Sequence, residues 1–323
     1  MRTISLGLLF SLQVFAGSAA TLKAVSKQSE AIDLLSQIIT GAVNPNTGTN
    51  RLKYLGQEKF AAHELANQFF KELDVERKRI VVQVLAGLGS REGEDAMVAA
   101  LSDPDATVRM YAAQGVGRIK SREAGPRLQA MLLDQTLGVR RDAARSIGML
   151  ADPRYGAAVA RAAKAEDDPE SRAVMLLATG QTGDKKQTAM LEGFLNHSSE
   201  STRFAAAAGL CVLGAAAGQK FAKAMLASKD RYQRMQGLML FEGSRAKESS
   251  ATLEPLLKDD DRSLQAAAAR ILYQGGDKSK LDWLVLHSFQ SLGEERLPYE
   301  NELETLRLTD DDRRAILRKA GIK

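Results

Sequence analysis

The sequence has few of the residues on which most catalytic and metal sites depend. It contains one cysteine, Cys211, and three histidines that lie far apart in the chain: His63, His197 and His287. A metal site needs several ligands close together, so these isolated histidines predict no metal centre. No serine lies in a Gly-x-Ser-x-Gly motif, and no segment has the Gly-x-Gly-x-x-Gly spacing of a dinucleotide site. We therefore predict a non-enzymatic protein without catalytic residues or a cofactor.

Aromatic residues are also scarce. They make up 5% of the chain, although 44% of its residues are hydrophobic. Small residues must therefore fill much of the core, and the runs 205–208, 215–217 and 266–269 consist of alanine alone. Alanine has the highest helix propensity and allows helices to approach closely. The composition predicts an all-α protein.

Neither sign of charge is in large excess. The 45 Lys and Arg residues against 40 Asp and Glu residues give a formal net charge of +5, and basic residues mostly lie close to acidic ones in the sequence. Proteins that bind nucleic acid usually gather basic residues into a stripe with aromatic residues between them. The chain has a single tryptophan. We therefore expect no nucleic-acid partner.

One long hydrophobic run is present, at the N-terminus. Arg2 precedes an apolar stretch at 4–16, and the small residues Ser18-Ala19-Ala20 follow. This pattern is typical of a secretory signal peptide, here cleaved after Ala20. A membrane-spanning helix is disfavoured because the stretch is shorter than about 20 residues. No cysteine near the cleavage point could accept a lipid and no later segment of the sequence is long and apolar enough to span a membrane, so we expect a periplasmic or secreted protein.

A repeat of about 31 residues dominates the rest of the chain. Five arginines recur at this nearly constant interval: Arg109, Arg140, Arg172, Arg203 and Arg234. Each lies near the start of a predicted helix, and another predicted helix ends shortly before it. The residue eight positions after the arginine is small in four units: Gly117, Gly148, Gly180 and Cys211. The pattern predicts pairs of helices that make close contacts at this position, where Cys211 has a packing role.

The residues around the arginine resemble a known family. The segment Asp103-Pro104-Asp105-Ala106-Thr107-Val108-Arg109, echoed by Asp168-Pro169-Glu170-Ser171-Arg172, resembles the start of the second helix of HEAT repeats in their short bacterial form. Asp as the cap with Pro as the first helical residue favours a helix N-terminus. The resemblance covers about residues 90–275 and implies an alpha-solenoid of antiparallel helix pairs, with acidic and basic residues in a ladder between repeats. The five arginines are therefore expected to be structural.

The ends of the chain differ from its middle. We expect a signal peptide at 1–20, an N-terminal cap helix and loop at 21–50, a repeat array at 51–276 and C-terminal capping helices at 277–323. The cap helix is predicted at 24–39, with a polar loop at 44–50, and the last helix is predicted to begin after the N-cap Thr309 with an acidic first turn. Single repeats bury too little apolar surface, so the units must stack.

Two rows of predicted outward positions on the second helices form the candidate partner-binding surface. They lie one and five residues after the repeating arginine, about 40° apart around a helix. With a neighbouring tyrosine, the candidates are Met110, Tyr111, Gln114, Arg141, Arg145, Phe204, Met235 and Met239. Exposed Met, aromatic and Arg side chains are typical anchors of protein interfaces. The alternative is that Phe204, Met235 and Leu177 pack against the next repeat.

These observations favour an exported binding or scaffold protein with a protein or peptide partner. Short HEAT-like repeats also occur in bilin lyases, and this resemblance implies the alternative of a cofactor-handling or accessory-enzyme protein that holds a tetrapyrrole. The export signal disfavours this alternative, because bilin lyases load their pigment in the cytoplasm. The pair His63-Glu64 resembles one of the His-Glu pairs that hold iron in HEAT-like deoxyhypusine hydroxylase. That family needs several such pairs, whereas serine follows His197 and His287 here.

The signal peptide gives a first prediction. Protein exported by its native cell should begin at Thr21, because the small residues Ser18 and Ala20 occupy the positions that a signal peptidase reads. N-terminal sequencing of the exported fraction measures this directly. An intact Met1 on protein from that fraction would contradict the prediction.

Overall fold

A computed structural model describes residues 19–69, 73–242 and 249–322. The apolar stretch of the predicted signal peptide lies outside these residues. The described residues form helices, turns and loops and contain no strand, which confirms the all-α prediction. They divide into two compact units, one up to Ile119 and one from Lys120 onwards, which we describe separately. None of the helices in these residues has the length and apolar character needed to cross a membrane.

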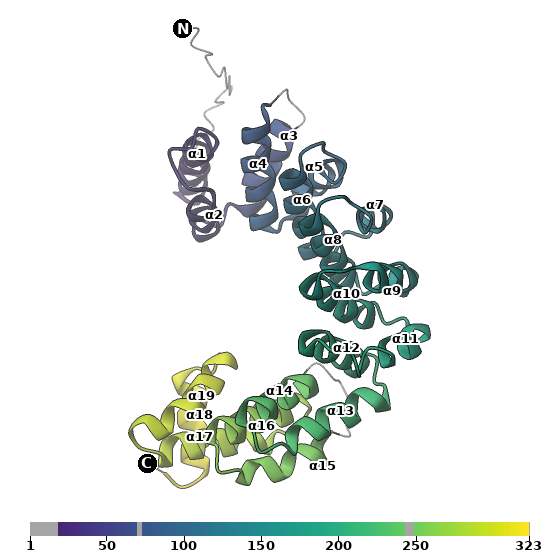
Figure 1. Cartoon of the computed structure of the whole chain (residues 1–323). Coiled ribbons are helices and arrows are strands. Elements are labelled where there is room, and N and C mark those ends of the chain that lie inside the picture. The colour runs from purple at the N-terminus through teal and green to yellow at the C-terminus, as the bar shows by residue number, and fades with distance from the viewer. Residues whose placement is uncertain (1–18, 70–72, 243–248, 323) are drawn as a thin grey trace. The chain divides into compact units, whose positions relative to one another are not determined.

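The first unit begins with a helical cap and continues with two helix pairs (Figure 1). Its elements are α1 (Ala19–Ile39), α2 (Pro45–Tyr54), α3 (Glu58–Phe69), α4 (Val75–Leu88), η1 (Arg91–Gly93), α5 (Glu94–Ala100) and α6 (Ala106–Arg118). Helix α3 pairs with α4 and α5 with α6, and α4 packs against both α2 and α6. In α1, Leu34, Leu35 and Ile38 are buried, as the apolar face of the predicted cap helix requires.

The predicted polar loop at 44–50 is wrong. Helix α2 begins at Pro45, and the Asn44 side chain caps it by accepting hydrogen bonds from the backbone N–H groups of Asn46 and Thr47, at 2.9 and 3.4 Å. Gly48 is buried so close to α1 that a Cβ there would lie 2.3 Å from Ile38 Cδ1. Packing against α1 therefore outweighs the low helix propensity of this segment.

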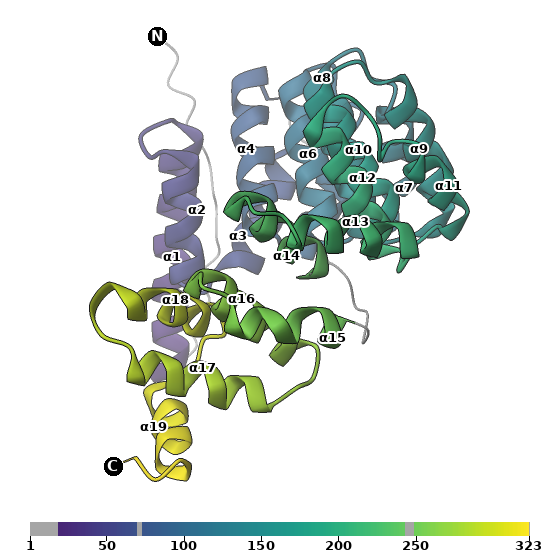
Figure 2. The ribbon, with the colours of Figure 1, turned by 60° about the horizontal axis from the view of Figure 1, so that its bottom comes forward.

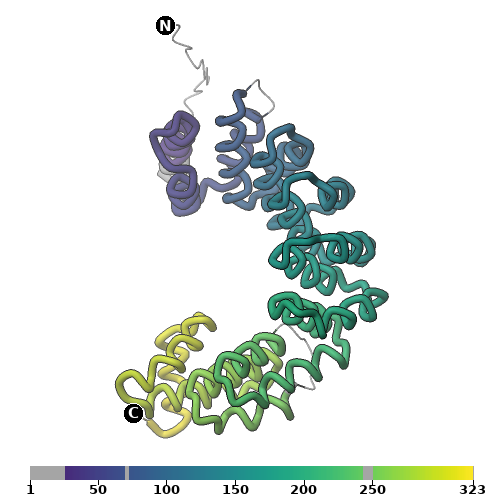
Figure 3. Tube along the Cα trace, viewed as in Figure 1, coloured from purple at the N-terminus to yellow at the C-terminus, as the bar shows by residue number. Residues whose placement is uncertain are grey.

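The second unit continues the helix pairs (Figure 3). They are α7 (Gly125–Met131) with α8 (Leu137–Leu150), α9 (Gly156–Ala165) with α10 (Pro169–Gln181), α11 (Thr188–Glu192) with α12 (Glu200–Val212), α13 (Ala216–Leu226) with α14 (Arg231–Glu242), and α15 (Ser249–Leu253) with α16 (Arg262–Gln274). Then follow α17 (Ser279–Gln290), α18 (Leu297–Thr305) and α19 (Asp310–Lys319), and short 3-10 helices lie at η2 (Pro153–Tyr155), η3 (Lys185–Gln187), η4 (Glu254–Lys258) and η5 (Gly293–Arg296). The chain is an alpha-solenoid of antiparallel helix pairs.

The first and second helices of each pair form separate layers in the second unit. Figures 1 and 2 both show α7, α9 and α11 on one side of α8, α10 and α12. The second helices approach each other at the small residues that the sequence singles out. A Cβ at Gly180 would lie 2.3 Å from the Gly209 Cα of α12, and a Cβ at Gly148 would lie 3.2 Å from the Ala178 Cα of α10. The predicted close contacts are confirmed in these two helices.

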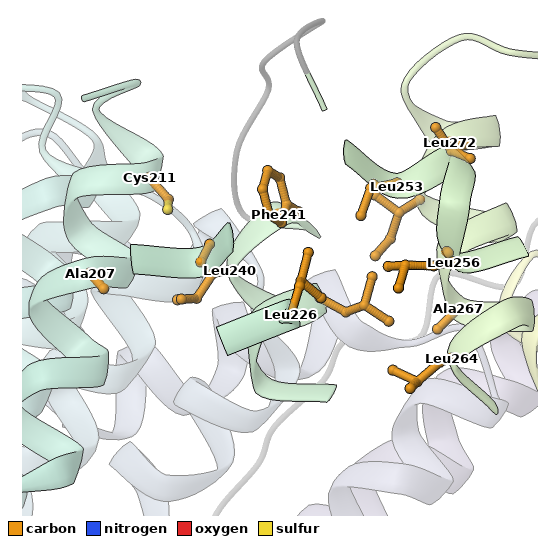
Figure 4. Close-up of a cluster of buried hydrophobic side chains, with 14 residues drawn as sticks. Ala207, Cys211, Leu226, Leu240, Phe241, Leu253, Leu256, Leu264, Ala267 and Leu272 are labelled. Carbon is orange, nitrogen blue, oxygen red and sulfur yellow. The ribbon is translucent and has the colours of Figure 1, made fainter. Parts of the chain in front are cut away.

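The stacking changes after α12. Helix α14 packs mainly against α13 and makes few contacts with α12. A buried apolar cluster fills this region, with Cys211 and Ala207 from α12, Leu226 from α13 and Leu240 from α14 among its members (Figure 4). Burial raises the pKa of the Cys211 thiol to about 11, so the thiol is neutral at physiological pH. This confirms its packing role.

Helix caps agree with the sequence in part. Asp168 caps α10 ahead of Pro169, and Thr309 forms a capping box with Asp312 at α19, as predicted. At α6 the cap is Asp105, whose carboxylate accepts a hydrogen bond from the Val108 N–H at 3.0 Å. Pro104 therefore precedes this cap and is not the first helical residue.

The buried cluster gives a prediction about stability. Ala207→Glu should lower the free energy of unfolding by about 3 kcal/mol or more, because Ala207 is fully buried and the new carboxylate would have no partner there. Urea denaturation followed by circular dichroism measures the loss. The control is Ala224→Glu on the exposed side of α13, which should change stability by less than about 0.5 kcal/mol. Equal stability of the two variants would contradict the packing described here.

Candidate functional site

From the α5–α6 pair to the α15–α16 pair, the turn between the two helices is closed by one residue, six positions before the repeating arginine or its replacement. We call these turn residues: Asp103, Asp134, Glu166, His197, Ser228 and Asp259, the last lying six positions before Gln265. The side chain of each accepts a hydrogen bond from the backbone N–H two residues further on, at 2.8 to 3.3 Å. That N–H belongs to the residue at the start of the second helix, so the turn residue fixes where this helix begins.

The repeating arginines, here called clamp arginines, bind the same turns. The guanidinium groups of Arg109, Arg140, Arg172, Arg203 and Arg234 donate to the backbone carbonyl of their own turn residue at 2.5 to 3.3 Å. Gln265, which replaces the arginine, makes the equivalent bond to the Asp259 carbonyl at 2.5 Å. These carbonyls lie in the turn, outside both helices, so each clamp satisfies a backbone group of the turn.

Some clamp arginines also reach the next repeat. Arg140 makes a two-pronged ion pair with Glu166, with Nε–Oε2 and Nη2–Oε1 distances of 2.8 and 3.1 Å. The Arg140 guanidinium lowers the pKa of the buried Glu166 carboxyl. Arg234 and Asp259 lie 3.6 Å apart. The ladder between repeats is thus present at these junctions, and the expected structural role of the clamp arginines is confirmed.

The ladder is interrupted at the two intervening junctions. Arg172 meets the imidazole of His197, with 3.4 Å between Nη1 and Nε2, in place of a carboxylate. The turn residue after Arg203 is Ser228, and within the described residues Arg203 makes no ion pair. This second junction is the one at which α14 packs mainly against α13.

Sequence analysis missed the arginine of the first unit. Arg79 lies about one repeat length before Arg109, a spacing visible in the sequence. Its Nε and Nη2 atoms donate to the two carboxylate oxygens of Asp105 at 3.0 and 2.6 Å. The hydrogen bonds from Arg79 are the main reason that the pKa of Asp105 falls to about 2, despite some desolvation. The ion pair therefore links α4 to the cap of α6.

The eight candidate partner-binding residues have different environments. In α6, Met110, Tyr111 and Gln114 are half-buried. In the second unit, Arg145 and Met239 are exposed, whereas Arg141, Phe204 and Met235 are half-buried. Phe204 and Met235 pack against the buried cluster of Figure 4. These two residues have at least a packing role, and partner binding by the rows stays a prediction.

Further apolar side chains extend the rows of the second unit. Met149 on α8 and Val212 on α12, nine positions after their clamp arginines, are 43% and 38% exposed, and Met239 is 57% exposed. We call the solvent-facing side of α8, α10, α12 and α14 the second-helix face. Arg145 is the exposed basic residue among the candidates on this face. Its Nη1 atom lies 2.7 Å from Oδ1 of the buried Asp142 carboxylate, with which it forms an ion pair. The face therefore offers apolar contacts more than free charge.

The three histidines lie in separate places, on α3, in the turn before α12 and on α17. His63 is exposed on α3, where its Nε2 lies 3.2 Å from Asn67 Nδ2. Among the residues that the structure describes, no group of three or more His, Cys, Asp or Glu side chains is arranged to hold a metal ion.

Comparison with known proteins agrees with the repeat geometry. Residues 62–148 match the family model of HEAT repeats. This segment consists of HEAT repeats. A chain from the complex of CpcE and CpcF of phycocyanin lyase from Nostoc sp. PCC7120 aligns with a TM-score of 0.54 and 19% identity, over 76% of this chain and 94% of that chain. The Escherichia coli protein YibA aligns with a TM-score of 0.50 and 18% identity, over 81% and 99%. No curated protein sequence matches the chain.

At these identities the likeness between this chain and the solved structures shows the fold alone. The helix pairs, the clamp arginines and the matched segment all describe the same scaffold. Function therefore has to be argued from the surfaces of this chain.

The ladder gives a prediction that separates the contribution of its ion pairs from that of the hydrogen bonds to turn carbonyls. Arg140→Met should lower the free energy of unfolding by about 3–5 kcal/mol, because it leaves the buried Glu166 carboxylate without its ion pair. Arg203→Met removes hydrogen bonds to turn carbonyls alone and should cost less, about 1.5–3 kcal/mol. Urea denaturation at pH 7 measures both.

The same pair of variants has a pH dependence of known sign. The folded-state pKa of Glu166 is lowered, so its pairing stabilises the protein above the ordinary glutamate pKa of about 4.3 and is lost as the pH falls below it. The difference between the two variants should therefore shrink below about pH 4. A difference that stays constant between pH 7 and pH 3.5 would argue against the Glu166 pair as its cause.

Proposed function

We propose that this chain is an exported, non-enzymatic scaffold that binds a protein or peptide through its second-helix face. The observation that carries the proposal is the set of exposed methionines, Met149 on α8 and Met239 on α14, on a face whose clamp arginines are occupied by the fold. Methionine side chains are flexible and polarisable, and they are common at binding surfaces that accept partners of varied shape.

The proposal of export rests on the N-terminal pattern and is compatible with helix α1. Where its side chains are described, from residue 26 onwards, the buried residues of α1 begin at Ala31. Cleavage after Ala20 would therefore leave these core contacts of the first unit in place. The periplasm or the extracellular medium is the expected location of the mature chain.

A double variant tests the binding face. Met149→Ser with Met239→Ser should keep the melting temperature within a few degrees, because both side chains are exposed, and should reduce partner capture at least tenfold. The measurement is affinity capture from the native cell envelope with quantification of the co-purified protein. The control is Tyr54→Ser with Leu292→Ser, which removes two exposed apolar side chains from other helices and loops. Equal capture by both double variants would overturn the proposed face.

The alternative function is handling of a tetrapyrrole cofactor. It is favoured by one observation, the shared fold with a chain of the phycocyanin lyase complex. Mixing the purified protein with haem or a bilin and recording absorbance spectra tests it. A shifted band with a one-to-one titration endpoint would support the alternative over the scaffold proposal.

A further inference from the structure

The first-helix side of the second unit carries basic side chains that the fold does not use. In the described part of residues 120–192, these side chains are exposed and take part in no ion pair: Lys120, Arg122, Arg127, Arg161, Lys164, Lys185 and Lys186. The clamp arginines of the second helices, by contrast, are all bound to turn carbonyls. The ion pairs of the fold therefore do not account for these seven cations, and their position on the surface leaves them available to a binding partner.

These residues lie on elements that adjoin one another. They belong to α7, α9, η3 and the loop before α7, and Figures 1 and 2 show α7 and α9 on the side of the unit opposite α8 and α10. Successive repeats touch on this side. A Cβ at Gly125 of α7 would lie 2.2 Å from the Tyr155 hydroxyl, and one at Gly156 of α9 would lie 2.4 Å from Asp184 Cβ. The seven cations thus share one surface, which we call the first-helix patch.

Acidic residues do not neutralise the first-helix patch. Asp152 is paired with Arg154, whose hydrogen bonds are the main reason that the pKa of Asp152 is lowered, and Arg122 adds a weaker electrostatic contribution. Asp184 caps η3 through its side chain. The exposed acids that remain on the first helices and in their turns are Glu123, Asp167 and Glu192, three against seven free cations. Glu166 is adjacent in sequence to the basic end of α9, but it points to Arg140 in the layer of second helices.

An apolar side chain accompanies the charges. Leu133, just after α7, is 84% exposed. It lies one position before the turn residue Asp134, and Lys164 lies two positions before the turn residue Glu166, so the two are near the same end of successive first helices. An exposed leucine beside lysines and arginines is typical of surfaces that lie on a bilayer, where the cations meet anionic headgroups and the apolar group enters the interface.

We propose that the first-helix patch binds the surface of a membrane that contains anionic phospholipids. The cations are long and exposed and form no ion pair among the described residues, which suits mobile headgroups better than a partner of fixed shape. The patch has no exposed aromatic side chain on which a nucleic-acid base could stack. This surface is separate from the second-helix face, so the scaffold could hold a partner while it rests on the membrane.

Vesicle co-sedimentation tests the proposal with the full chain. The vesicles are phosphatidylcholine alone, or phosphatidylcholine and phosphatidylglycerol mixed two to one, each at low salt and at high NaCl concentration. We expect binding to the anionic vesicles alone and its loss at high salt, because each basic residue near such a surface contributes about a fivefold factor to partitioning. Arg127→Glu with Arg161→Glu and Lys164→Glu should reduce partitioning at least a hundredfold. Leu133→Ser should reduce it several-fold without removing the salt dependence.

A matched variant controls for net charge and for the N-terminus. Lys53→Glu with Lys59→Glu and Lys278→Glu makes the same change in charge at exposed positions outside the patch and should keep most of the binding. All variants have the same N-terminal residues, so any contribution of these cancels. Equal loss in both triple variants, or equal binding to neutral vesicles, would overturn the proposal. Binding of an acidic protein or a nucleic acid through the patch, with no binding to vesicles, would assign the patch to that class of partner instead.

Discussion

The fold depends on how the carbonyl groups of the turn between two paired helices find hydrogen-bond donors. These carbonyls lie outside both helices, so no helical N–H is aligned to satisfy them. The clamp arginine of the following helix supplies the donors, and the side chain of the turn residue accepts the N–H at the start of that helix. Gln265 has a shorter side chain than arginine and still donates to the backbone carbonyl of its turn residue, Asp259. The position tolerates a change of residue as long as a donor remains.

The sequence predicted the helix pairs and their close contacts because each depends on one residue type at one spacing. The interval between clamp arginines and the small residue eight positions later both have a single structural task, so they recur. The helix at 45–54 was missed because its stability comes from burial of Gly48 against Ile38, which no local pattern records. Basic residues mostly lie close to acidic ones in the sequence, but Glu166, which follows Arg161 and Lys164, directs its carboxylate to Arg140.

The candidate surface was predicted less well than the fold. Positions one residue after the clamp arginine were expected to face outward, but Phe204 and Met235 are half-buried against the core cluster. Outward positions deduced from a fixed offset along a helix are the same in every unit only if each repeat stacks on the previous one in the same way. Helix α14 instead packs mainly against α13, in the unit where Glu242 replaces the small residue eight positions after the clamp arginine.

The serine at the turn of the α13–α14 repeat has a consequence for cooperativity. In a solenoid, stability is close to a sum of terms for each repeat and for each interface between neighbours. Arg203 and Ser228 form no ion pair, so the interface at this junction depends on apolar contacts of α12 with α13 and α14, which the buried cluster provides. At the Arg140–Glu166 junction an ion pair adds to such contacts. One substitution in a turn can thus change the chemistry that couples two repeats without interrupting the stack.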